Sequence, residues 1–586
     1  MSVCSKKYLS MLTQKINFHN TIPVNRRLKI SFVNPPHADW SLCNNMTFLM
    51  CQTFYNHVGK YKEFVDWIKP PYKWNNYQTV YDVFQEIKEA DIIMFSSYAW
   101  NYGINDELAK YIKNNHPEKI CVLGGPHIGT NEPEFLITRT FYDFICQPTK
   151  PGEPFIEDLI DSWFETNGKP NFEDISWELK SCKKTNHNMN YGISVYEEHF
   201  DYLKEMLDYA KQNKMEPFII LESTRGCPYK CVFCEWGGGT GTKIIKKDID
   251  LVKRDILALK KAGFRDAYLT DANFGAFKDR DIEIFRFAWE NGFNLTDIST
   301  VKTKNLEKRK ELIDSWFEIV GSKFQKQLKD EVNTLDMWDE TKFSSVVPTV
   351  SIQSISETAM KIADRTDLST KDKIELSRYI KEKCEEKNYP IPAIELILGM
   401  PGSTLDDFYN EMEIIWNFQA WSSFRHDYMF LTDSQLNSPE YKEKYQIKTV
   451  EVYSDIVDED GIDNWNSLYK NKRTYFKTMQ SCFSYTQDEM HEMWFMNNAG
   501  NFLLKNIYSN IKDYIDAPNF GRECFKIISK LEDFKPIYNE IVDIFDEKTS
   551  PKSIRKLQGS FRTDVIEKML SKNHMIIRNE ILKKVL

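Results

Sequence analysis

Residues 222–239 read ESTRGCPYKCVFCEWGGG, and this stretch indicates more about the fold than any other part of the chain. Its three cysteines, Cys227, Cys231 and Cys234, have C-x3-C-x2-C spacing and follow an apolar, strand-like run at 217–221. Three thiolates on one short loop can converge on an iron–sulfur cubane and leave one iron with open coordination positions. The spacing therefore predicts a metal-binding loop whose coordination an exogenous ligand completes.

Zinc and reactive thiols are the alternatives for this loop. Structural zinc prefers four protein ligands, and no further Cys or His lies between Cys234 and Cys384. Disulfide or reactive-thiol explanations fit poorly with three thiols on a single loop in a reducing compartment. We therefore favour a cluster.

Helix and strand patterns alternate beyond the cysteine loop. The expected elements are helix 247–262, strand 266–270, helix 279–291, strand 295–301, helix 305–320, strand 346–352, helix 371–387, strand 393–398, helix 405–418 and strand 424–431. With the strand at 217–221 these make six strands, and the alternation predicts a partial (β/α)6 barrel with its site at the strands' carboxyl ends. The residues at those ends are Asp271, Asn273, Lys302, Ser351, Gln353 and Gly399. The alternative for each of these residues is a purely structural role, as a cap or in a turn.

The N-terminal part, about 28–165, also has an α/β pattern and predicts a Rossmann-like parallel sheet flanked by helices. Four strands are expected, at 28–33, 91–97, 120–123 and 142–145, and each runs into loop-forming residues. Ligands bind at the carboxyl ends of such strands, where glycines allow close approach and helix N-termini offer unpaired N–H groups. We expect the four loops to form one rim.

Three motifs in this order, SSYAWN at 96–101, LGGPHIG at 123–129 and GEPF at 152–155, resemble the cobalamin-binding domain of cobalamin-dependent radical SAM enzymes. The resemblance implies that cobalamin is bound by Ser97, Tyr98, Trp100, Asn101, Gly124, Gly125, Pro126, Gly152, Glu153 and Phe155. The D-x-H-x-x-G motif is absent here, so cobalt would have no histidine lower ligand, although His37 and His127 lie on the rim. A simple tight turn is the alternative for the Gly-Gly-Pro segment.

The cysteine motif closely resembles that of the radical SAM superfamily, which implies a [4Fe-4S] cluster held by Cys227, Cys231 and Cys234. In that family the amino and carboxylate groups of S-adenosylmethionine chelate the open iron. The segments DANFGAF at 271–277, TVSIQS at 349–354 and ELILGMPGSTLDDF at 395–408 resemble those that hold S-adenosylmethionine. Asp271 and Asn273 would then meet its amino group or ribose, and Ser351 and Gln353 its ribose or carboxylate. Gly399 belongs to the same set, and Phe233 would lie beside the adenine unless it is a core residue.

Composition limits the partners and the compartment. The chain has 586 residues, a net charge of −9 and twelve cysteines, which excludes a secreted disulfide scaffold and disfavours nucleic acid as a partner. Polar residues break every apolar run near the N-terminus, and the apolar runs elsewhere are too short to cross a membrane. We expect a cytoplasmic protein.

The domain prediction is a cobalamin-binding domain at 1–165, a linker with a helical segment at 166–215, a radical SAM barrel at 216–440 and a mostly helical domain at 441–586. NSPEYKEKYQI at 437–447 and CFSYTQDEMHEMW at 482–494 resemble the C-terminal part of members that modify peptides. The resemblance implies methylation of an unactivated carbon, with methylcobalamin as methyl donor, a peptide (or a small molecule) as substrate and flavodoxin or ferredoxin as electron donor. An oxidative cyclisation or rearrangement without methyl transfer is the alternative, and a non-catalytic sensor is a more remote one.

Overall fold

The computed structural model describes residues 26–36, 41–128, 137–146, 152–170, 192–234, 244–296, 298–300, 303–321, 350–365, 367–387, 389, 394–417, 423–427, 430–432, 434–453, 467–471, 475–545 and 560–586. The chain forms two compact units. The first contains Met1–Ala267, Leu431–Ser438 and Ile462–Tyr475, and the second contains Tyr268–Phe430, Pro439–Gly461 and Phe476–Leu586.

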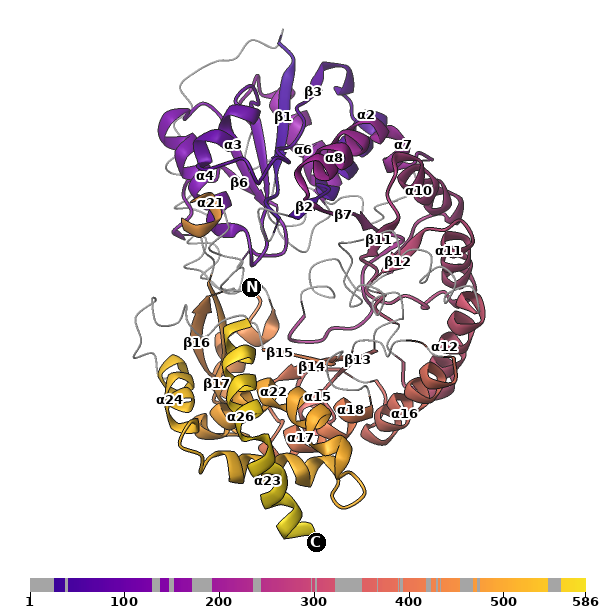
Figure 1. Cartoon of the computed structure of the whole chain (residues 1–586). Coiled ribbons are helices and arrows are strands. Elements are labelled where there is room, and N and C mark those ends of the chain that lie inside the picture. The colour runs from indigo at the N-terminus through magenta and orange to yellow at the C-terminus, as the bar shows by residue number, and fades with distance from the viewer. Residues whose placement is uncertain are drawn as a thin grey trace. The chain divides into compact units, whose positions relative to one another are not determined.

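A parallel sheet forms the centre of the first unit (Figure 1). Its strands are β1 (Leu28–Val33), β3 (Val65–Trp67), β4 (Ile92–Ser96), β5 (Ile120–Gly124) and β6 (Phe144–Ile145), in the order β3-β1-β4-β5-β6. The four predicted strands are confirmed, and β3 adds a fifth at the edge. Counted along the chain, this order is the flavodoxin-like 2-1-3-4-5, whose switch point lies between β1 and β4.

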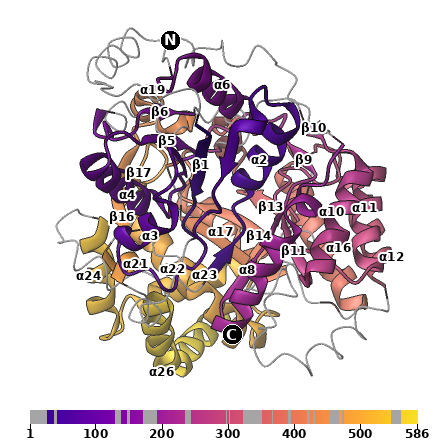
Figure 2. The same ribbon diagram turned by 90° about the horizontal axis from the view of Figure 1, so that it is seen from above.

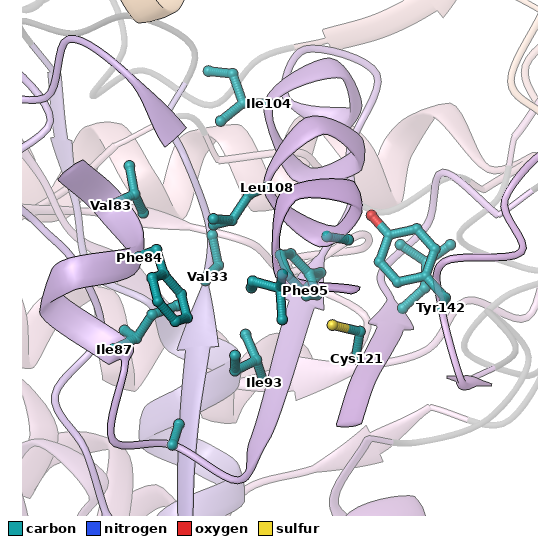
Figure 3. Packing of buried hydrophobic residues seen from close by; sticks show 14 of the residues in the cluster. Val33, Val83, Phe84, Ile87, Ile93, Phe95, Ile104, Leu108, Cys121 and Tyr142 are labelled. Carbon is teal, nitrogen blue, oxygen red and sulfur yellow. The ribbon is translucent and has the colours of Figure 1, made fainter. Parts of the chain in front are cut away.

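Helices cover both faces of this sheet. On one face, Val33, Ile93 and Phe95 of the strands share a core with α3 (Val80–Ile87) and α4 (Tyr102–Asn115), as Figure 3 shows. On the other face, Phe32 packs edge-to-face against Phe48 of α2 (Met46–Val58), with ring centroids 5.6 Å apart, and α2 contacts α6 (Gly152–Glu165). Strands buried on both faces explain the near-continuous apolar runs in the sequence.

Two later segments complete the first unit. Leu468 and Tyr469 of α21 (Ser467–Asn471) belong to the core of the N-terminal sheet, and the Tyr469 hydroxyl donates to the carbonyl of Pro36, at 3.1 Å. The other segment, Leu431–Ser438, contains the short helix η3 (Gln435–Asn437).

The remaining elements of the first unit lead into and out of the cysteine loop. They are β2 (Ser41–Cys43), η1 (Lys62–Phe64), α7 (Val195–Glu198), α8 (Phe200–Asn213), β7 (Glu216–Phe218), β8 (Ile220–Leu221), β9 (Thr224–Arg225), β10 (Ile245–Lys246) and α10 (Ile249–Ala262). β2 pairs in parallel with β7, a connection that spans the predicted linker. Strand β11 (Asp266–Leu269), at which the chain passes to the second unit, lies in a sheet of order β12-β11-β8.

The second unit continues the alternation. Its first part contains α11 (Lys278–Glu290), β12 (Asn294–Thr296), α12 (Leu306–Val320), β13 (Val350–Gln353), α15 (Glu357–Ile362), α16 (Thr370–Lys387), β14 (Ile394–Leu398), α17 (Leu405–Asn410), α18 (Met412–Asn417) and β15 (Ser423–Asp427). β13, β14 and β15 pair in parallel, and α11, α12 and α16 pack side by side (Figure 2). All six predicted strands are present, divided in the described residues between two three-stranded sheets.

Helices dominate the last part of the second unit. Its elements are α19 (Pro439–Lys444), β16 (Lys448–Tyr453), β17 (Tyr475–Ser481), α22 (Gln487–Asn506), η4 (Tyr508–Asn510), α23 (Ala517–Ile528), α24 (Phe534–Phe545) and α26 (Ser560–Val585). The mostly helical character is confirmed, whereas the sequence pattern missed the paired strands β16 and β17. Among the described residues, no helix is both long enough and apolar enough to cross a membrane.

Candidate functional site

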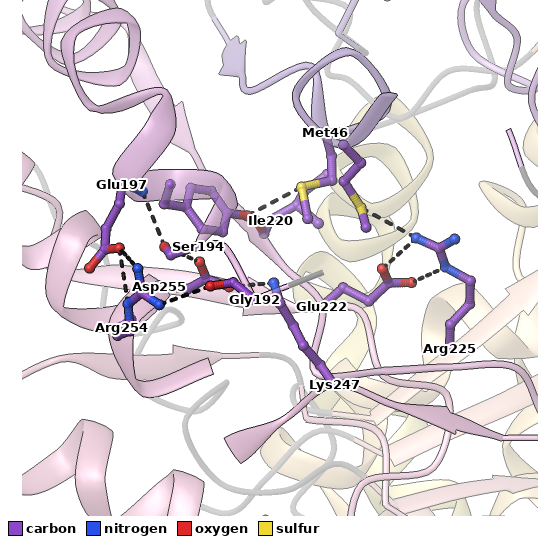
Figure 4. A network of polar contacts seen from close by, with 12 residues as sticks. Met46, Gly192, Ser194, Glu197, Ile220, Glu222, Arg225, Lys247, Arg254 and Asp255 are labelled. Carbon is purple, nitrogen blue, oxygen red and sulfur yellow. Dashed lines mark hydrogen bonds and ion pairs between the residues drawn. The ribbon is translucent and has the colours of Figure 1, made fainter. Parts of the chain in front are cut away.

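The cysteine loop begins and ends at one place in the first unit. β9 and β10 pair antiparallel, with Arg225 opposite Ile245 and Thr224 opposite Lys246, so they close the loop between them. Behind β10, the side chain of Lys247 forms a buried ion pair with Asp255 of α10, and Asp255 also accepts from the hydroxyl of Ser194 (Figure 4). This anchoring fixes the chain just after the loop.

The three thiols fit an iron–sulfur cluster by their chemistry. The Cys234 N–H donates to the Cys231 carbonyl at 3.0 Å, which places these two cysteines on one turn. Cys227, four residues before Cys231, is buried. The described cysteines form no disulfide. Within the described ranges no three His, Cys, Asp or Glu side chains are grouped closely enough to hold a metal ion as they stand. The cluster therefore stays a prediction from the motif.

A distant segment supports this loop. The N–H of Leu436, in η3, donates to the carbonyl of Val232, at 2.9 Å, and both side chains are buried. Val232 lies between Cys231 and Cys234, with the half-buried Phe233 next to it. The backbone of the motif is thus held by residues about 200 positions further along the chain.

Arg225 connects the cysteine loop to α6. Its guanidinium donates to both carboxylate oxygens of Glu153, at 3.0 and 3.1 Å, and to both oxygens of Glu222, at 2.9 and 2.8 Å. The Arg225 side chain is 15% exposed and that of Glu153 4%. Figure 4 shows the part of this network formed by Arg225 and Glu222. Glu153, predicted to bind cobalamin, therefore has its carboxylate engaged by an arginine two residues before Cys227.

Gly152 and Phe155, the other predicted residues of this motif, lie in the first turn of α6. Phe155 is buried and Gly152 half-buried. An acidic residue in the first helical turn, here Glu153, also interacts favourably with the helix dipole.

Asn101 joins two loops at the switch point of the N-terminal sheet. Its amide nitrogen lies 3.1 Å from the side-chain oxygen of Asn34, 3.0 Å from the Pro35 carbonyl and 3.1 Å from the Ser96 carbonyl. Its side-chain oxygen accepts from the N–H of Tyr98. The fully buried Asn101 thus fixes the loops after β1 and β4 to each other, a structural role that the sequence did not predict.

The backbone at Gly125 fits a close-packed rim. Gly125 has φ +97°, and a Cβ there would lie 2.4 Å from the carbonyl oxygen of Ser97. The Ser97 hydroxyl is buried and has no hydrogen-bond partner among the described residues. An orphaned hydroxyl at the carboxyl end of β4 fits a site that a polar ligand completes. The residues present are therefore compatible with cobalamin, and the half-buried Gly124 and Pro126 flank the same turn.

Two aromatic pairs border this rim. Tyr98 and Trp100 stack with centroids 4.6 Å apart and ring planes at 12°, and the Trp100 side chain is 38% exposed. The His127 ring stacks on Tyr102, also at 4.6 Å, and the backbone N–H of His127 donates to the Ser97 carbonyl. His37 lies outside the described residues. The expectation that cobalt has no histidine lower ligand stays a prediction.

In the second unit, Asp271 and Asn273 are buried in the loop after β11. The Asp281 carboxylate holds this loop by accepting from the N–H groups of Gly275 and Phe277, at 2.8 and 3.1 Å. Burial raises the pKa of Asp281. Lys302 lies outside the described residues.

Ser351 and Gln353 are buried at the carboxyl end of β13. The Ser351 hydroxyl donates to the carboxylate of Glu395 on β14. The pairing of the two strands shifts register between Ser351 and Gln353, which makes Ile352 the extra residue of a β-bulge. Bulges of this kind re-aim side chains near functional sites.

Gly399, after β14, is held by the C-terminal part of the same unit. It has φ +80°, and its carbonyl accepts from the hydroxyl of Tyr485, at 2.6 Å. Ser484 accepts from the N–H of Gly402, at 2.9 Å, and donates to the Ser403 carbonyl, at 2.8 Å. The CFSY segment noted in the tail thus fixes the loop predicted to contact S-adenosylmethionine.

The fold is shared with solved cobalamin-dependent radical SAM enzymes. TsrM from Kitasatospora setae, solved with cobalamin and a [4Fe-4S] cluster, has a TM-score of 0.51 at 13% identity and covers 89% of this chain and 99% of its own. OxsB, solved with aqua-cobalamin and S-adenosylmethionine, has a TM-score of 0.50 at 12% identity and covers 100% and 85%. These structures confirm the predicted α/β fold class with its N-terminal Rossmann-like sheet.

Curated relatives point to the same class. The chain is 23% identical over 374 residues to the cobalamin-dependent radical SAM methyltransferase TokK of Streptomyces tokunonensis. It is 24% identical over 370 residues to the 2-(S-pantetheinyl)-carbapenam-3-carboxylate methyltransferase of Streptantibioticus cattleyicolor. Each match covers 62% of this chain and 50% of the relative, so the chain spans about half the length of these proteins. No family model matches. The chain is thus similar, at 23–24% identity, to two methyltransferases, of which TokK is a cobalamin-dependent radical SAM enzyme.

Proposed function

We propose that this protein is a C-methyltransferase that uses a [4Fe-4S] cluster, S-adenosylmethionine and cobalamin to methylate an unactivated carbon. The observation that carries the proposal is the Arg225–Glu153 ion pair, because it joins the three-cysteine loop to the motif expected at the cobalamin site within one unit. When bound, the reduced cluster would supply the electron that cleaves S-adenosylmethionine, and cobalamin would supply the methyl group.

The chain's own residues would bind and orient the cluster, S-adenosylmethionine and cobalamin, and would shield S-adenosylmethionine from water. Cys227, Cys231 and Cys234 would hold the cluster through their thiolates, on a loop that β9 and β10 close. Asp271, Asn273, Ser351 and Gln353 would bind S-adenosylmethionine, and their burial would exclude water from it. Ser97 and the turn at Gly125 would contact cobalamin.

The proposed substrate is a ribosomally made peptide, on the resemblance of residues 437–447 and 482–494 to peptide-modifying members. Two of the similar proteins are associated with small molecules: the Streptantibioticus cattleyicolor methyltransferase with a carbapenam, and TsrM with its substrate tryptophan. The substrate test therefore has two arms. A flavodoxin or a ferredoxin is the proposed electron donor.

The proposal is tested with the full chain, reconstituted anaerobically with iron, sulfide and cobalamin and supplied with a reductant and methyl-deuterated S-adenosylmethionine. One arm contains a library of synthetic peptides and the other contains free tryptophan. We expect 5′-deoxyadenosine, S-adenosylhomocysteine and a peptide that carries the deuterated methyl group. Methylation only in the tryptophan arm would overturn the peptide assignment.

Controls separate this function from its alternatives. Cys231→Ala should abolish 5′-deoxyadenosine formation and leave cobalamin binding intact, whereas Cys43→Ala, in β2, should change neither. Formation of 5′-deoxyadenosine together with an altered but unmethylated product would favour an oxidative cyclisation or rearrangement. Failure of the fully reconstituted chain to bind cobalamin would contradict the proposal.

A further inference from the structure

Gln353 has a backbone conformation that few residues of its type adopt. Its φ is +66°, and the N–H of Ser354 donates to the carbonyl of Ile352, at 2.8 Å, across it. A hydrogen bond from residue i+2 to residue i around a central residue with positive φ defines the classic γ-turn, which is rare and strained. Such conformations persist only where the surroundings hold them in place.

Lys373 provides that support from α16. Its ammonium group donates to the carbonyls on both sides of Gln353, at 3.2 Å to Ile352 and 2.8 Å to Ser354. Its third contact is an ion pair with Asp367, at 3.3 Å, and both side chains are only 2–3% exposed. An ammonium has three N–H donors, so the three acceptors use all of them.

Neighbouring groups hold the rest of the segment. Arg365 donates to the carbonyl of Ser351 and pairs with Asp367, at 3.0 Å. Glu411 accepts from the hydroxyl of Ser354, at 2.9 Å, and from the N–H of Ile355, at 3.2 Å. The carbonyls of residues 351, 352 and 354 are thus all bonded to cationic side chains.

We propose that Lys373 is a positioning residue that holds the γ-turn at Gln353 and thereby sets the S-adenosylmethionine-binding geometry of Ser351 and Gln353. This inference rests on the proposed function, because it assigns those two side chains to that cofactor. Lys373 itself acts only through the backbone of residues 352–354.

The proposal predicts a pH dependence of cofactor binding. Burial lowers the pKa of Lys373 to about 8, opposed by the charge of Asp367 and assisted by that of Arg365, with Glu411 also facing it. Above that pH the amine loses one of its three donors and its charge, so the turn is held less firmly. An arginine at this position would keep its charge throughout.

Binding of S-adenosylmethionine to the reconstituted full chain, measured by equilibrium dialysis, tests the proposal. We expect Lys373→Met to weaken binding at least tenfold, Lys373→Arg to retain most of it, and Lys371→Met, an exposed lysine on the same helix, to match the wild type. Between pH 7 and pH 9 the wild type should lose affinity and Lys373→Arg should not. Unchanged affinity in Lys373→Met would overturn the proposal.

A second measurement separates this inference from the proposed function. Hydrogen exchange of peptides covering 350–356, without S-adenosylmethionine, should be faster in Lys373→Met than in the wild type and in Lys371→Met. Exchange at the wild-type rate would overturn the inference even if cofactor binding is normal. Wild-type protein that binds no S-adenosylmethionine would instead overturn the proposed function, while faster exchange in Lys373→Met would still support Lys373 as the group that holds the turn.

Discussion

Arg225 and Glu153 form a buried ion pair in which one guanidinium nitrogen donates to both carboxylate oxygens, at 3.0 and 3.1 Å. Arg225 lies two residues before Cys227, and Glu153 is the second residue of α6. The position of the cysteine loop is therefore fixed by the start of α6, a helix that contacts α2.

Replacing Arg225 should destabilise the first unit. Arg225→Met would leave Glu153 and Glu222 without their cation, and removing one partner of a buried pair costs about 3–5 kcal/mol. We expect a lower temperature of thermal unfolding and fewer irons per chain after reconstitution. The control is Arg254→Met, which breaks the exposed pair with Glu197 and should cost less than about 1 kcal/mol. Equal melting of the two variants would contradict this role.

Gly125→Ala should impair cobalamin binding. A methyl group there would lie 2.4 Å from the Ser97 carbonyl oxygen, on a backbone at φ +97° that costs a non-glycine residue about 1–3 kcal/mol. Gly192 lies outside the predicted site and also has a positive φ, +80°, but no atom lies within 4 Å of an added Cβ there, so Gly192→Ala provides a matched control. Absorbance titration with cobalamin should show weaker binding for Gly125→Ala only. Wild-type affinity in both variants would exclude the turn from the site.

Tyr485→Phe should loosen the loop after β14. The change removes the hydroxyl that donates a hydrogen bond to the Gly399 carbonyl. Leaving a buried carbonyl without this partner costs about 1–3 kcal/mol of stability. We expect weaker binding of S-adenosylmethionine with cobalamin binding unchanged. Tyr514→Phe, at a residue 57% exposed, is the control for removal of a tyrosine hydroxyl. A loss of cofactor binding that is the same in both variants would argue against the contact.

The pKa of Lys373 also predicts how stability changes with pH. Its folded pKa is about 8 and its ordinary value 10.5, so between these values the unfolded chain holds more protons than the folded one. The free energy of unfolding should therefore rise with pH across this window, by about 3 kcal/mol in all, and stay level below pH 8. Lys373→Met should lack this rise, and Lys371→Met should keep it, when thermal unfolding is followed from pH 7.5 to pH 10. The same slope in Lys373→Met as in the wild type would contradict the assignment.

Sequence patterns predicted the strands with long apolar runs but missed the short ones. β1, β4 and β5 lie close to their predicted bounds because four or five consecutive buried residues give a clear signal. β3 and β2 have three residues each, and β2 pairs with a strand more than 170 positions later. Pairing over such a distance leaves no local pattern.

The candidate site residues could be predicted where a motif has a characteristic residue spacing, and not where a contact arises only from tertiary packing. The cysteines could be identified from their intervals alone. The hydrogen bonds of Asn101 to the loop after β1, and those of Lys373 and Tyr485 to their backbone carbonyls, could not be predicted. Each joins residues that are distant in sequence. A lysine on an amphipathic helix and a tyrosine in a turn carry no signal that separates them from their neighbours. Arg225 lies within the cysteine motif, but the sequence predicted cobalamin binding for Glu153 and not its ion pair with Arg225.

The placement of Leu468 and Tyr469 in the core of the N-terminal sheet has a consequence for biosynthesis. A ribosome makes residues 28–145, which contain all five strands of that sheet, long before it reaches residue 469. Until then the nascent sheet lacks part of its core, including the tyrosine that bonds to the loop after β1. The sheet is therefore completed only once Leu468 and Tyr469 have been made, and a chain released before them would leave an unfilled apolar face for chaperones to recognise.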